Sequence, residues 1–181
     1  MDWLMQLDGN ILLWIQEHIR TEFLDPVVVF ISSLGNAGWF WLLLLAALML
    51  FPRYRKVGIS GFAAVLIGFI ITNVCIKNVV ARIRPYEVIE GLEMLGVKPS
   101  DFSFPSGHST CSAAASLVLF FMLPKRAGVP LLALGILICL SRLYVGVHYP
   151  TDVLAGALIG AAAAAVVLFR VKNRAAPDGP V

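Results

Sequence analysis

The chain has 181 residues and a formal net charge of +3, and 59% of its residues are hydrophobic while only 14% are charged. Soluble domains carry roughly 25% charged residues, so this composition predicts an integral membrane protein. It excludes intrinsic disorder, which needs low hydrophobicity, and a disulfide scaffold, because the three cysteines show no paired spacing. Lysine and arginine form no block with interleaved aromatic residues, so nucleic acid is not expected as a partner.

The first segment, residues 1–35, carries apolar side chains at roughly helical spacing: Trp3, Leu4, Leu7, Ile11, Trp14, Ile15 and Ile19. Charged or ionisable residues interrupt them: Asp8, Glu17, His18 and Arg20. This pattern is typical of an amphipathic helix lying at the membrane interface. Asp25 and Pro26 are expected to cap and start a second helix that runs through Ile31. The stretch from Pro26 to Leu34 is short for a membrane span, so whether it crosses stays open.

Five later segments approach the roughly 20 apolar residues that a helix needs to cross a bilayer. They are Trp39 to Phe51, Val57 to Ile76, Ser106 to Leu123, Val129 to Val147 and Val153 to Phe169. Backbone groups in lipid must be hydrogen-bonded within their own segment, so helices are predicted. Gly156 and Gly160 in the last segment indicate close helix packing. The sequence therefore predicts an all-α polytopic bundle of five to six transmembrane helices over residues 36–174, followed by a flexible tail over residues 175–181.

Basic residues outside the polar motifs gather in three places: Arg53, Arg55 and Lys56; Lys125 and Arg126; and Arg170, Lys172 and Arg174. If each segment crosses once, all three clusters lie on one side of the membrane. The positive-inside rule makes that side cytoplasmic. The connections 77–105 and 147–151 then face away from the cytoplasm, and the C-terminus is cytoplasmic.

Ionisable residues also lie at the far-side ends of these segments, where they are costly and by default indicate function. Three of them are cations, Lys77, Arg84 and Arg142. If these cations converge, they need an anion, and phosphate is the anion that arginine binds with two parallel hydrogen bonds. The predicted helix that opens at Ser106 and Gly107 offers free N–H groups and a positive dipole end to the same anion. Arg82 is expected to have an interfacial or structural role.

Two histidines, His108 and His148, occur at the same predicted depth. Histidine moves protons near neutral pH. Asp152 follows His148 by four residues and would accept a hydrogen bond from one of the histidines. Such a bond fixes the tautomer and makes the other ring nitrogen a better nucleophile.

In this order, the polar segments resemble the signature of the type-2 phosphatidic acid phosphatase superfamily. Its motifs are matched without substitution by Lys77 to Pro85 (Lys, six residues, Arg-Pro), Pro105 to His108 (Pro-Ser-Gly-His) and Ser141 to Asp152 (Ser-Arg, five residues, His, three residues, Asp). The superfamily includes membrane lipid phosphatases, glucose-6-phosphatase and the soluble vanadium haloperoxidases. A soluble haloperoxidase-like role is disfavoured by the predicted spans.

The resemblance implies a metal-independent histidine phosphatase that uses no cofactor. It implies that His148 attacks phosphorus and forms a phosphohistidine, that Asp152 orients His148, and that His108 protonates the leaving oxygen and then activates water. It further implies that the phosphate is bound by Lys77, Arg84, Ser106, Gly107 and Arg142.

A reaction centre at the membrane face suits a lipid phosphate embedded in the cell membrane. Among the substrates that the resemblance implies, we expect hydrolysis of undecaprenyl diphosphate to undecaprenyl phosphate and phosphate on the extracytoplasmic face, although no residue of the motifs distinguishes a diphosphate from a monophosphate. Phosphatidylglycerol phosphate and phosphatidic acid stay open as substrates of the same mechanism, and so do transfer to another acceptor and hydrolysis of a soluble phosphate ester. The non-enzymatic alternative is a lipid-phosphate binding or transport protein. The oligomeric state is left open.

Overall fold

A computed structural model describes residues 2–175, and over this range the chain is all-helical without strands. The elements are α1 (Asp2–His18), α2 (Leu24–Ser33), η1 (Asn36–Gly38), α3 (Trp39–Leu50), α4 (Arg55–Phe69), the π-helical η2 (Ile70–Ile76), α5 (Lys77–Val80), α6 (Pro85–Val88), α7 (Gly107–Met122), α8 (Lys125–Tyr144) and α9 (Pro150–Ala175). The tail expected over residues 175–181 starts with the last residue of α9 and otherwise lies outside the described residues.

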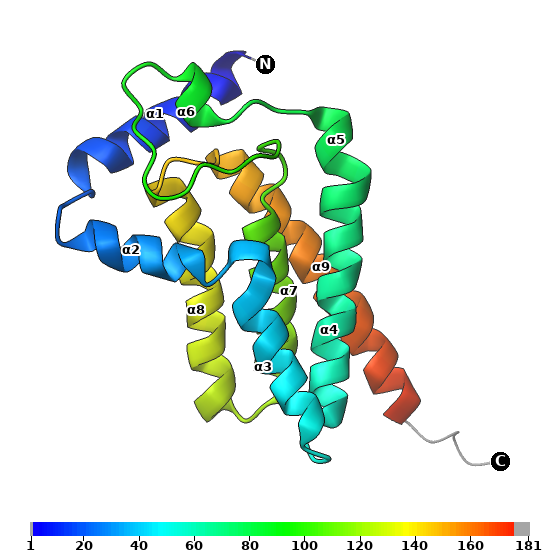
Figure 1. Ribbon diagram of the computed structural model, residues 1–181. Helices are drawn as coiled ribbons and strands as arrows, with labels where there is room; N and C mark the ends of the chain where they lie inside the picture. Colours follow the sequence, from blue (N-terminus) through cyan, green and yellow to red (C-terminus); the bar gives the residue numbers. More distant parts are fainter. Residues whose placement is uncertain (1, 176–181) are drawn as a thin grey trace.

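Five helices, α3, α4, α7, α8 and α9, form a bundle, and each corresponds to one apolar segment that the sequence predicts (Figure 1). In this bundle α7 lies at the centre and packs against α4, α8 and α9. Burial of apolar side chains drives this packing, since Trp41, Leu45, Val118 and Ile138 are fully buried between the helices. The indole of Trp41 still donates a hydrogen bond of 3.0 Å to the Ser112 hydroxyl, which satisfies its polar atom.

Three helical stretches of the described chain are long and apolar enough to cross a membrane: Arg55–Val88, Lys125–Tyr144 and Pro150–Asn173. A fourth crossing results if α2 and the helix Asn36–Leu50, which are bent by 50° at their break, count as one span. The apolar helix α7 is shorter, with 16 residues. The prediction of an all-α membrane bundle is confirmed, whereas the predicted count of five to six transmembrane helices is not.

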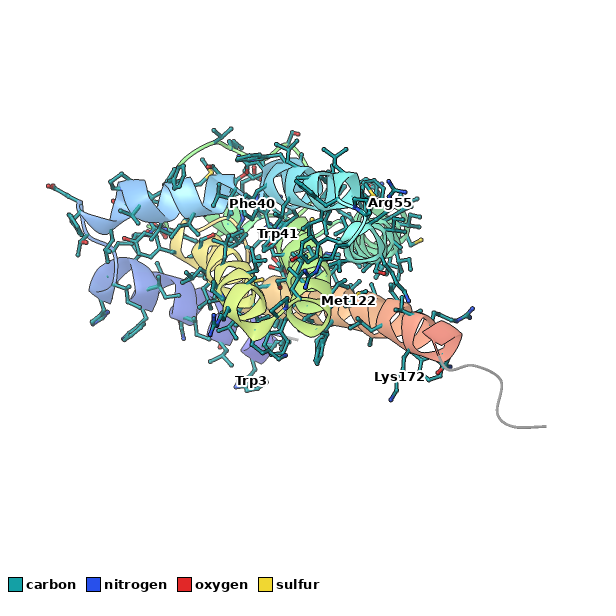
Figure 2. All side chains as sticks on the ribbon, turned by 90° about the horizontal axis from the view of Figure 1, so that it is seen from below. Trp3, Phe40, Trp41, Arg55, Met122 and Lys172 are labelled. Atoms are coloured by element: carbon teal, nitrogen blue, oxygen red, sulfur yellow. The ribbon has the colours of Figure 1, made fainter. Side chains whose placement is uncertain are left out.

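The two N-terminal helices lie across one end of the bundle, beside the loops that carry the polar motifs (Figure 1). In α1, Trp3 is largely exposed and Leu12 is fully buried, as expected for an amphipathic helix. The three basic clusters lie at the opposite end, from which Figure 2 views the molecule with Arg55 and Lys172 labelled.

The start of α2 differs from the prediction that Asp25 caps it. The helix begins at Leu24, whose N–H donates to the Thr21 hydroxyl at 3.2 Å. Asp25 therefore lies in the first turn, where its carboxylate accepts a hydrogen bond of 2.8 Å from the Tyr144 hydroxyl. The Asp25 carboxylate thus binds the distant Tyr144 hydroxyl and does not cap the helix, a tertiary contact that the local sequence does not show.

Gly156 and Gly160 form the contact between α9 and α7, which confirms the close packing that the sequence predicts. A Cβ atom at Gly156 would lie 2.4 Å from the Ser106 carbonyl oxygen, and one at Gly160 would lie 2.3 Å from the Thr110 carbonyl oxygen. Backbone atoms cannot move aside as a flexible side chain can, so only glycine permits this approach. The contact sets the position of α7, and α7 begins at the motif residue Gly107.

We expect Gly160→Val to destabilise the protein by about 1–3 kcal/mol, the usual cost of overpacking a close contact. The matched control is Ala162→Val, which adds a similar branched side chain at an exposed position two residues away on α9. Thermal unfolding of both variants in the same detergent measures the difference. An equal melting temperature in the two variants would contradict the packing of α9 on α7.

Candidate active site

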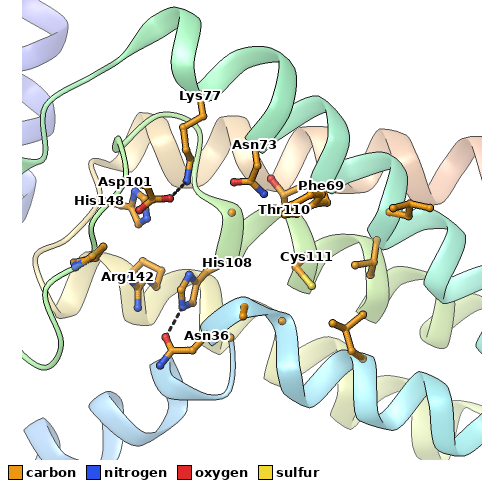
Figure 3. A pocket seen from close by; sticks show the side chains of 18 of the residues that line it. Asn36, Phe69, Asn73, Lys77, Asp101, His108, Thr110, Cys111, Arg142 and His148 are labelled. Carbon is orange, nitrogen blue, oxygen red and sulfur yellow. Dashed lines mark hydrogen bonds and ion pairs between the residues drawn. The ribbon is translucent and has the colours of Figure 1, made fainter.

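The three polar motifs meet around one cavity of about 540 Å³ at the end of the bundle where α1 and α2 lie (Figure 1). Six of the predicted site residues line it: Lys77, Arg84, Gly107, His108, Arg142 and His148. Figure 3 shows Lys77, His108, Arg142 and His148 around one part of the cavity, with Phe69 and Cys111 farther along it. Ser106 and Asp152 lie behind the lining residues.

His148 lies in the connection between α8 and α9 and is almost completely buried. Its Nδ1 atom is 3.5 Å from Oδ2 of Asp152 and 3.4 Å from the Ser103 hydroxyl. Asp152 Oδ2 also accepts hydrogen bonds from the Ser103 hydroxyl and, at 2.9 Å, from the Tyr149 N–H. With a proton on Nδ1, which faces the carboxylate, the lone pair of Nε2 is available on the other side of the ring.

Arg84 holds its guanidinium against this free nitrogen. Nη1 donates to the Val147 carbonyl at 2.7 Å and lies 3.4 Å from His148 Nε2. Nε and Nη2 donate to the backbone carbonyl and the carboxylate of Asp101 at 2.8 and 2.7 Å. These bonds fix the planar fork in one orientation beside the nucleophilic position of the histidine.

Arg142 comes from the last turn of α8 and reaches the cavity from the opposite side to Lys77 (Figure 3). Its Nη1 donates to the Ser32 hydroxyl at 2.5 Å. Its Nε is buried and has no hydrogen-bond partner among the described residues. A buried charged donor without a partner is costly, so an anion in the cavity would stabilise it.

Lys77 follows the π-helical segment η2, a rare helical form that is enriched at functional sites. Its Nζ forms an ion pair of 2.5 Å with Asp101, which also pairs with Arg84. Burial raises the pKa of the Asp101 carboxyl, but the hydrogen bonds and charges of Lys77 and Arg84 outweigh it and lower this pKa to about 2. The half-exposed Asp101 carboxylate is therefore ionised and neutralises two of the three cations.

His108 lies one residue into α7, and its position depends on the turn that enters α3. Its Nε2 atom is 3.0 Å from the side-chain oxygen of Asn36 (Figure 3). Gly35 lies against the ring, since a Cβ atom there would be 2.5 Å from His108 Cδ2. With Nε2–H donating to Asn36, Nδ1 is left free to exchange a proton with a bound group.

Ser106 is the N-cap of α7 and does not line the cavity. Its hydroxyl accepts from the Ser109 hydroxyl at 3.0 Å and from the Ser109 N–H at 3.4 Å, and its own N–H donates to the Asp152 carbonyl. The structure thus places Ser106 as the residue that joins α7 to α9. Gly107, next in the chain, lines the cavity at the helix N-terminus, where backbone N–H groups favour an anion.

The cavity continues away from the charged residues between α3 and α4. Its wall there consists of apolar side chains, which are Leu42, Phe62, Val65, Leu66 and Phe69. Phe62, Leu66 and Phe69 are also partly exposed on the surface of the bundle. One cavity therefore joins a cationic end to an apolar end, and the apolar end lies beside an exposed apolar surface of α4.

Four residues near the site are not among those that the sequence predicts for it: Asn36, Asp101, Ser103 and Asp8. Asp101 and Ser103 lie four and two residues before Pro105, where the second motif starts, so a carboxylate and a hydroxyl near that motif are the signal by which the sequence could have indicated them. Asp8 is buried although it lies on an amphipathic surface helix. Arg82, expected to be interfacial or structural, donates from Nη1 to Asp152 Oδ1 at 2.7 Å.

The fold and the cavity define the class of protein: a helical membrane protein with a cationic site at one end of its bundle. A family model described as the PAP2 superfamily matches residues 56–176. The chain belongs to this superfamily, and the resemblance seen in its motifs is confirmed.

Curated relatives agree with this membership. The undecaprenyl-diphosphatase of Sulfolobus acidocaldarius is 35% identical over 137 residues, which are 76% of this chain and 66%, slightly under two thirds, of the relative. The undecaprenyl-diphosphatase BcrC of Bacillus subtilis is 34% identical and covers 87% of this chain and 80% of its own length. The similarities support a membrane lipid phosphatase.

A solved structure shows the same fold. The crystal structure of a transmembrane PAP2-type phosphatidylglycerolphosphate phosphatase from Bacillus subtilis superimposes with a TM-score of 0.80 at 25% identity. The match covers 96% of this chain and 88% of that one. It therefore includes the N-terminal helices, which lie outside the region matched by the family model.

Asp101→Asn removes the charge that neutralises Lys77 and Arg84, so we expect inorganic phosphate to bind more tightly. The expected change is about fivefold, since a partly exposed ion pair contributes about 1 kcal/mol. Competitive inhibition of phosphate release by added phosphate measures it. Asp25→Asn, a carboxylate on α2 that is bonded to Tyr144, is the matched control. Unchanged or weaker phosphate inhibition in Asp101→Asn would contradict competition between the carboxylate and phosphate.

Proposed function

We propose that this protein hydrolyses a lipid phosphate through a phosphohistidine on His148, with undecaprenyl diphosphate as its substrate. The observation that carries the proposal is the orientation of one imidazole. His148 presents Nδ1 to Asp152 and Nε2 to Arg84 at the edge of a cavity lined by three cations. This is the arrangement of an activated nucleophile beside groups that stabilise charge on a phosphoryl oxygen.

In the first step, His148 Nε2 attacks phosphorus and the bond from phosphorus to the leaving oxygen breaks. Lys77, Arg84 and Arg142 bind the other phosphoryl oxygens, together with the N–H groups at the start of α7 that include Gly107. His108 donates a proton to the leaving oxygen, which yields undecaprenyl phosphate and phosphohistidine. Positioning and charge stabilisation dominate phosphoryl transfer, so fixed cations suit this step.

In the second step, His108, now neutral, accepts a proton from water while the water oxygen attacks phosphorus. The phosphorus–nitrogen bond breaks, and inorganic phosphate and free His148 result. Asp152 stabilises the charge on the imidazole in both steps through Nδ1. The mechanism assigns no step to a metal ion.

The apolar part of the cavity supports a substrate with a hydrocarbon chain. Leu66 and Phe69 on α4 line the same cavity as His148, so a hydrocarbon chain against them would leave its phosphate near the imidazole. The names of the two undecaprenyl-diphosphatase relatives support a polyprenyl diphosphate. The Bacillus subtilis relative named phosphatidylglycerophosphatase B, at 31% identity, keeps phosphatidylglycerol phosphate as the second candidate substrate.

We also propose that the active site faces away from the cytoplasm. The motif loops and the three basic clusters lie at opposite ends of the bundle (Figure 1). Positive residues are retained on the cytoplasmic side. The C-terminal end of α9 is then cytoplasmic, and phosphate is released outside the cell membrane.

Purified protein is expected to release phosphate from undecaprenyl diphosphate faster than from phosphatidylglycerol phosphate or phosphatidic acid in matched detergent containing EDTA. We expect His148→Ala to lower kcat by about 1,000-fold or more, because it removes the nucleophile. The control is His18→Ala, an exposed histidine of α1 stacked on Trp14, which should keep the full rate.

Different results would overturn separate parts of the proposal. Phosphate release that survives in His148→Ala would contradict the phosphohistidine. Release from none of the lipids, with binding intact, would favour a lipid-phosphate binding or transport protein. Faster release from phosphatidylglycerol phosphate would contradict the proposed substrate, undecaprenyl diphosphate, but not the proposed mechanism.

The His148 imidazole should be uncharged even at pH values well below 7. Burial lowers the pKa of His148 to about 4, and the charges of Arg142 and Arg84 add to this, while the contact with Asp152 opposes it. His148 is then unprotonated above about pH 4 and able to attack. We therefore expect kcat/KM, corrected for titration of the substrate phosphate, to fall with decreasing pH near pH 4, where His148 becomes protonated. The ordinary pKa of histidine would put this fall near 6.5. An acid limb at 6.5 or above would show that the imidazole is not held neutral.

A further inference from the structure

Arg82 and Asp8 form a buried polar network behind the His148–Asp152 pair, on the side away from the cavity. Arg82 lies in the connection between α5 and α6, and Asp8 lies on α1, 74 residues earlier in the chain. The guanidinium binds two carboxylates at once, since Nη1 donates to Asp152 Oδ1 at 2.7 Å and Nη2 donates to Asp8 Oδ2 at 2.9 Å. Asp8 lies outside the three motifs, and Arg82 occupies a position of the first motif at which no residue is specified.

Asp8 is held in this position by the first turn of α9. It is only 2% exposed, and its Oδ1 accepts from the Thr151 N–H at 3.1 Å while its Oδ2 accepts from the Thr151 hydroxyl at 2.5 Å. The Thr151 hydroxyl in turn accepts from Arg82 Nη1 at 2.7 Å. The result is a closed ring of hydrogen bonds that joins α1, the Arg82 loop and the start of α9.

The ring of Tyr149 covers the guanidinium of Arg82, whose central carbon lies 3.7 Å from the ring centroid. Stacking of this kind restricts the planar group to one orientation. The guanidinium of Arg82 is therefore held by stacking on its planar face and by hydrogen bonds from the nitrogen atoms at its edge.

This network divides the two oxygens of Asp152 between different partners. Oδ1 is bound by Arg82, and Oδ2 faces His148 Nδ1 at 3.5 Å. Rotation of the carboxylate would break the bond to Arg82, so Arg82 holds Oδ2 toward the imidazole. Asp8 offsets the positive charge of Arg82, which leaves the net charge of the network negative and able to stabilise an imidazolium.

We propose that Arg82 and Asp8 are positioning residues for the nucleophile: Arg82 sets the orientation of Asp152, and Asp8 on the N-terminal helix anchors and charge-balances Arg82. The inference rests on the proposed function, in which His148 is the nucleophile. It links α1 to the active site through Arg82 and Asp152, although α1 precedes the region matched by the family model.

Other charged groups also face His148, and the test leaves them unchanged. Arg84 contacts Nε2 from the α5–α6 connection, and the charges of Arg142 on α8 and His108 on α7 reach it across the cavity. Lys77 and Asp101 complete the same end of the cavity. Changes at Arg82 and Asp8 leave these groups in place and act on His148 from the side of Asp152 and Tyr149.

The test compares Arg82→Gln, Arg82→Lys and Asp8→Asn in the purified full chain with undecaprenyl diphosphate. We expect Arg82→Gln to lower kcat about 10- to 100-fold with little change in KM, as for residues that orient a reactive histidine from behind. Arg82→Lys should restore part of kcat, because it keeps the charge but not the two-carboxylate fork.

The pH dependence should move in opposite directions in the two charge variants. Arg82→Gln removes a positive charge behind Asp152, so His148 should protonate at higher pH than in the unmodified protein. Asp8→Asn removes a negative charge with nearly the same shape, so His148 should protonate at lower pH. NMR titration of the imidazole signals measures this without substrate, because the chain has only three histidines.

The matched controls are Arg20→Gln and Asp25→Asn, which also join the N-terminal helices to the bundle. Arg20 donates to the carbonyl oxygens of Tyr144 and Glu93, both at 2.7 Å, and Asp25 accepts from the Tyr144 hydroxyl. Neither contacts Asp152. Both controls should keep the kcat and the His148 titration of the unmodified protein, after correction for the folded fraction.

Opposite shifts in Arg82→Gln and Asp8→Asn, absent from the controls, would support the positioning role. Equal behaviour of these variants and the controls, or shifts in the same direction, would overturn it. If the unmodified protein releases no phosphate from any lipid, the proposed function fails, and the NMR titration still decides whether Arg82 and Asp8 act on His148.

Discussion

The structure depends on the burial of three cations around a space that only an anion can fill. Lys77, Arg84 and Arg142 are 5%, 4% and 6% exposed. Burying unpaired charge costs several kcal/mol per ion, so such a cluster persists only with partners or with a ligand. Asp101 neutralises two of the cations, and one buried donor of Arg142 has no partner within the described part of the chain.

The helices around this cluster supply the rigidity that it needs. α7 begins at the site, is capped by Ser106 and is held against α9 by two glycine contacts. The connections that carry Arg84 and His148 are tied together by the bond from Arg84 to the Val147 carbonyl. Long-range bonds of their side chains thus hold Arg84 and Arg142 in place, and the packing of α7 on α9 fixes the helix start that carries His108. Preorganised electrostatic catalysis requires such fixed groups.

The sequence predicts the helical segments well, because apolar length is a local rule. The convergence of the motifs is long-range, and the expectation of it rests on the family resemblance of residues that are far apart in the chain. Apolar length predicts the helices, and His148 and Asp152 are four residues apart at the start of α9. The contacts of Asp101, Asp8 and Asn36 were not predictable in this way. Asp8 meets Thr151 across 143 residues and Asn36 meets His108 across 72, so these pairings depend on loop paths and on how α1 and α2 lie across the bundle.

The central claim is that His148 carries the phosphoryl group between the two steps. The most direct measurement is mass spectrometry of peptides, under alkaline conditions that preserve phosphohistidine, after brief incubation of His108→Asn with undecaprenyl diphosphate. Loss of His108 removes the proton donor of the first step and the group that activates water in the second. The departing undecaprenyl phosphate is a stable anion, so we expect the second step to slow more and the intermediate to accumulate. The account predicts a phosphoryl group on His148 and none on His18. A phosphoryl group on another residue, or stoichiometric product release without any phosphorylated peptide, would contradict it.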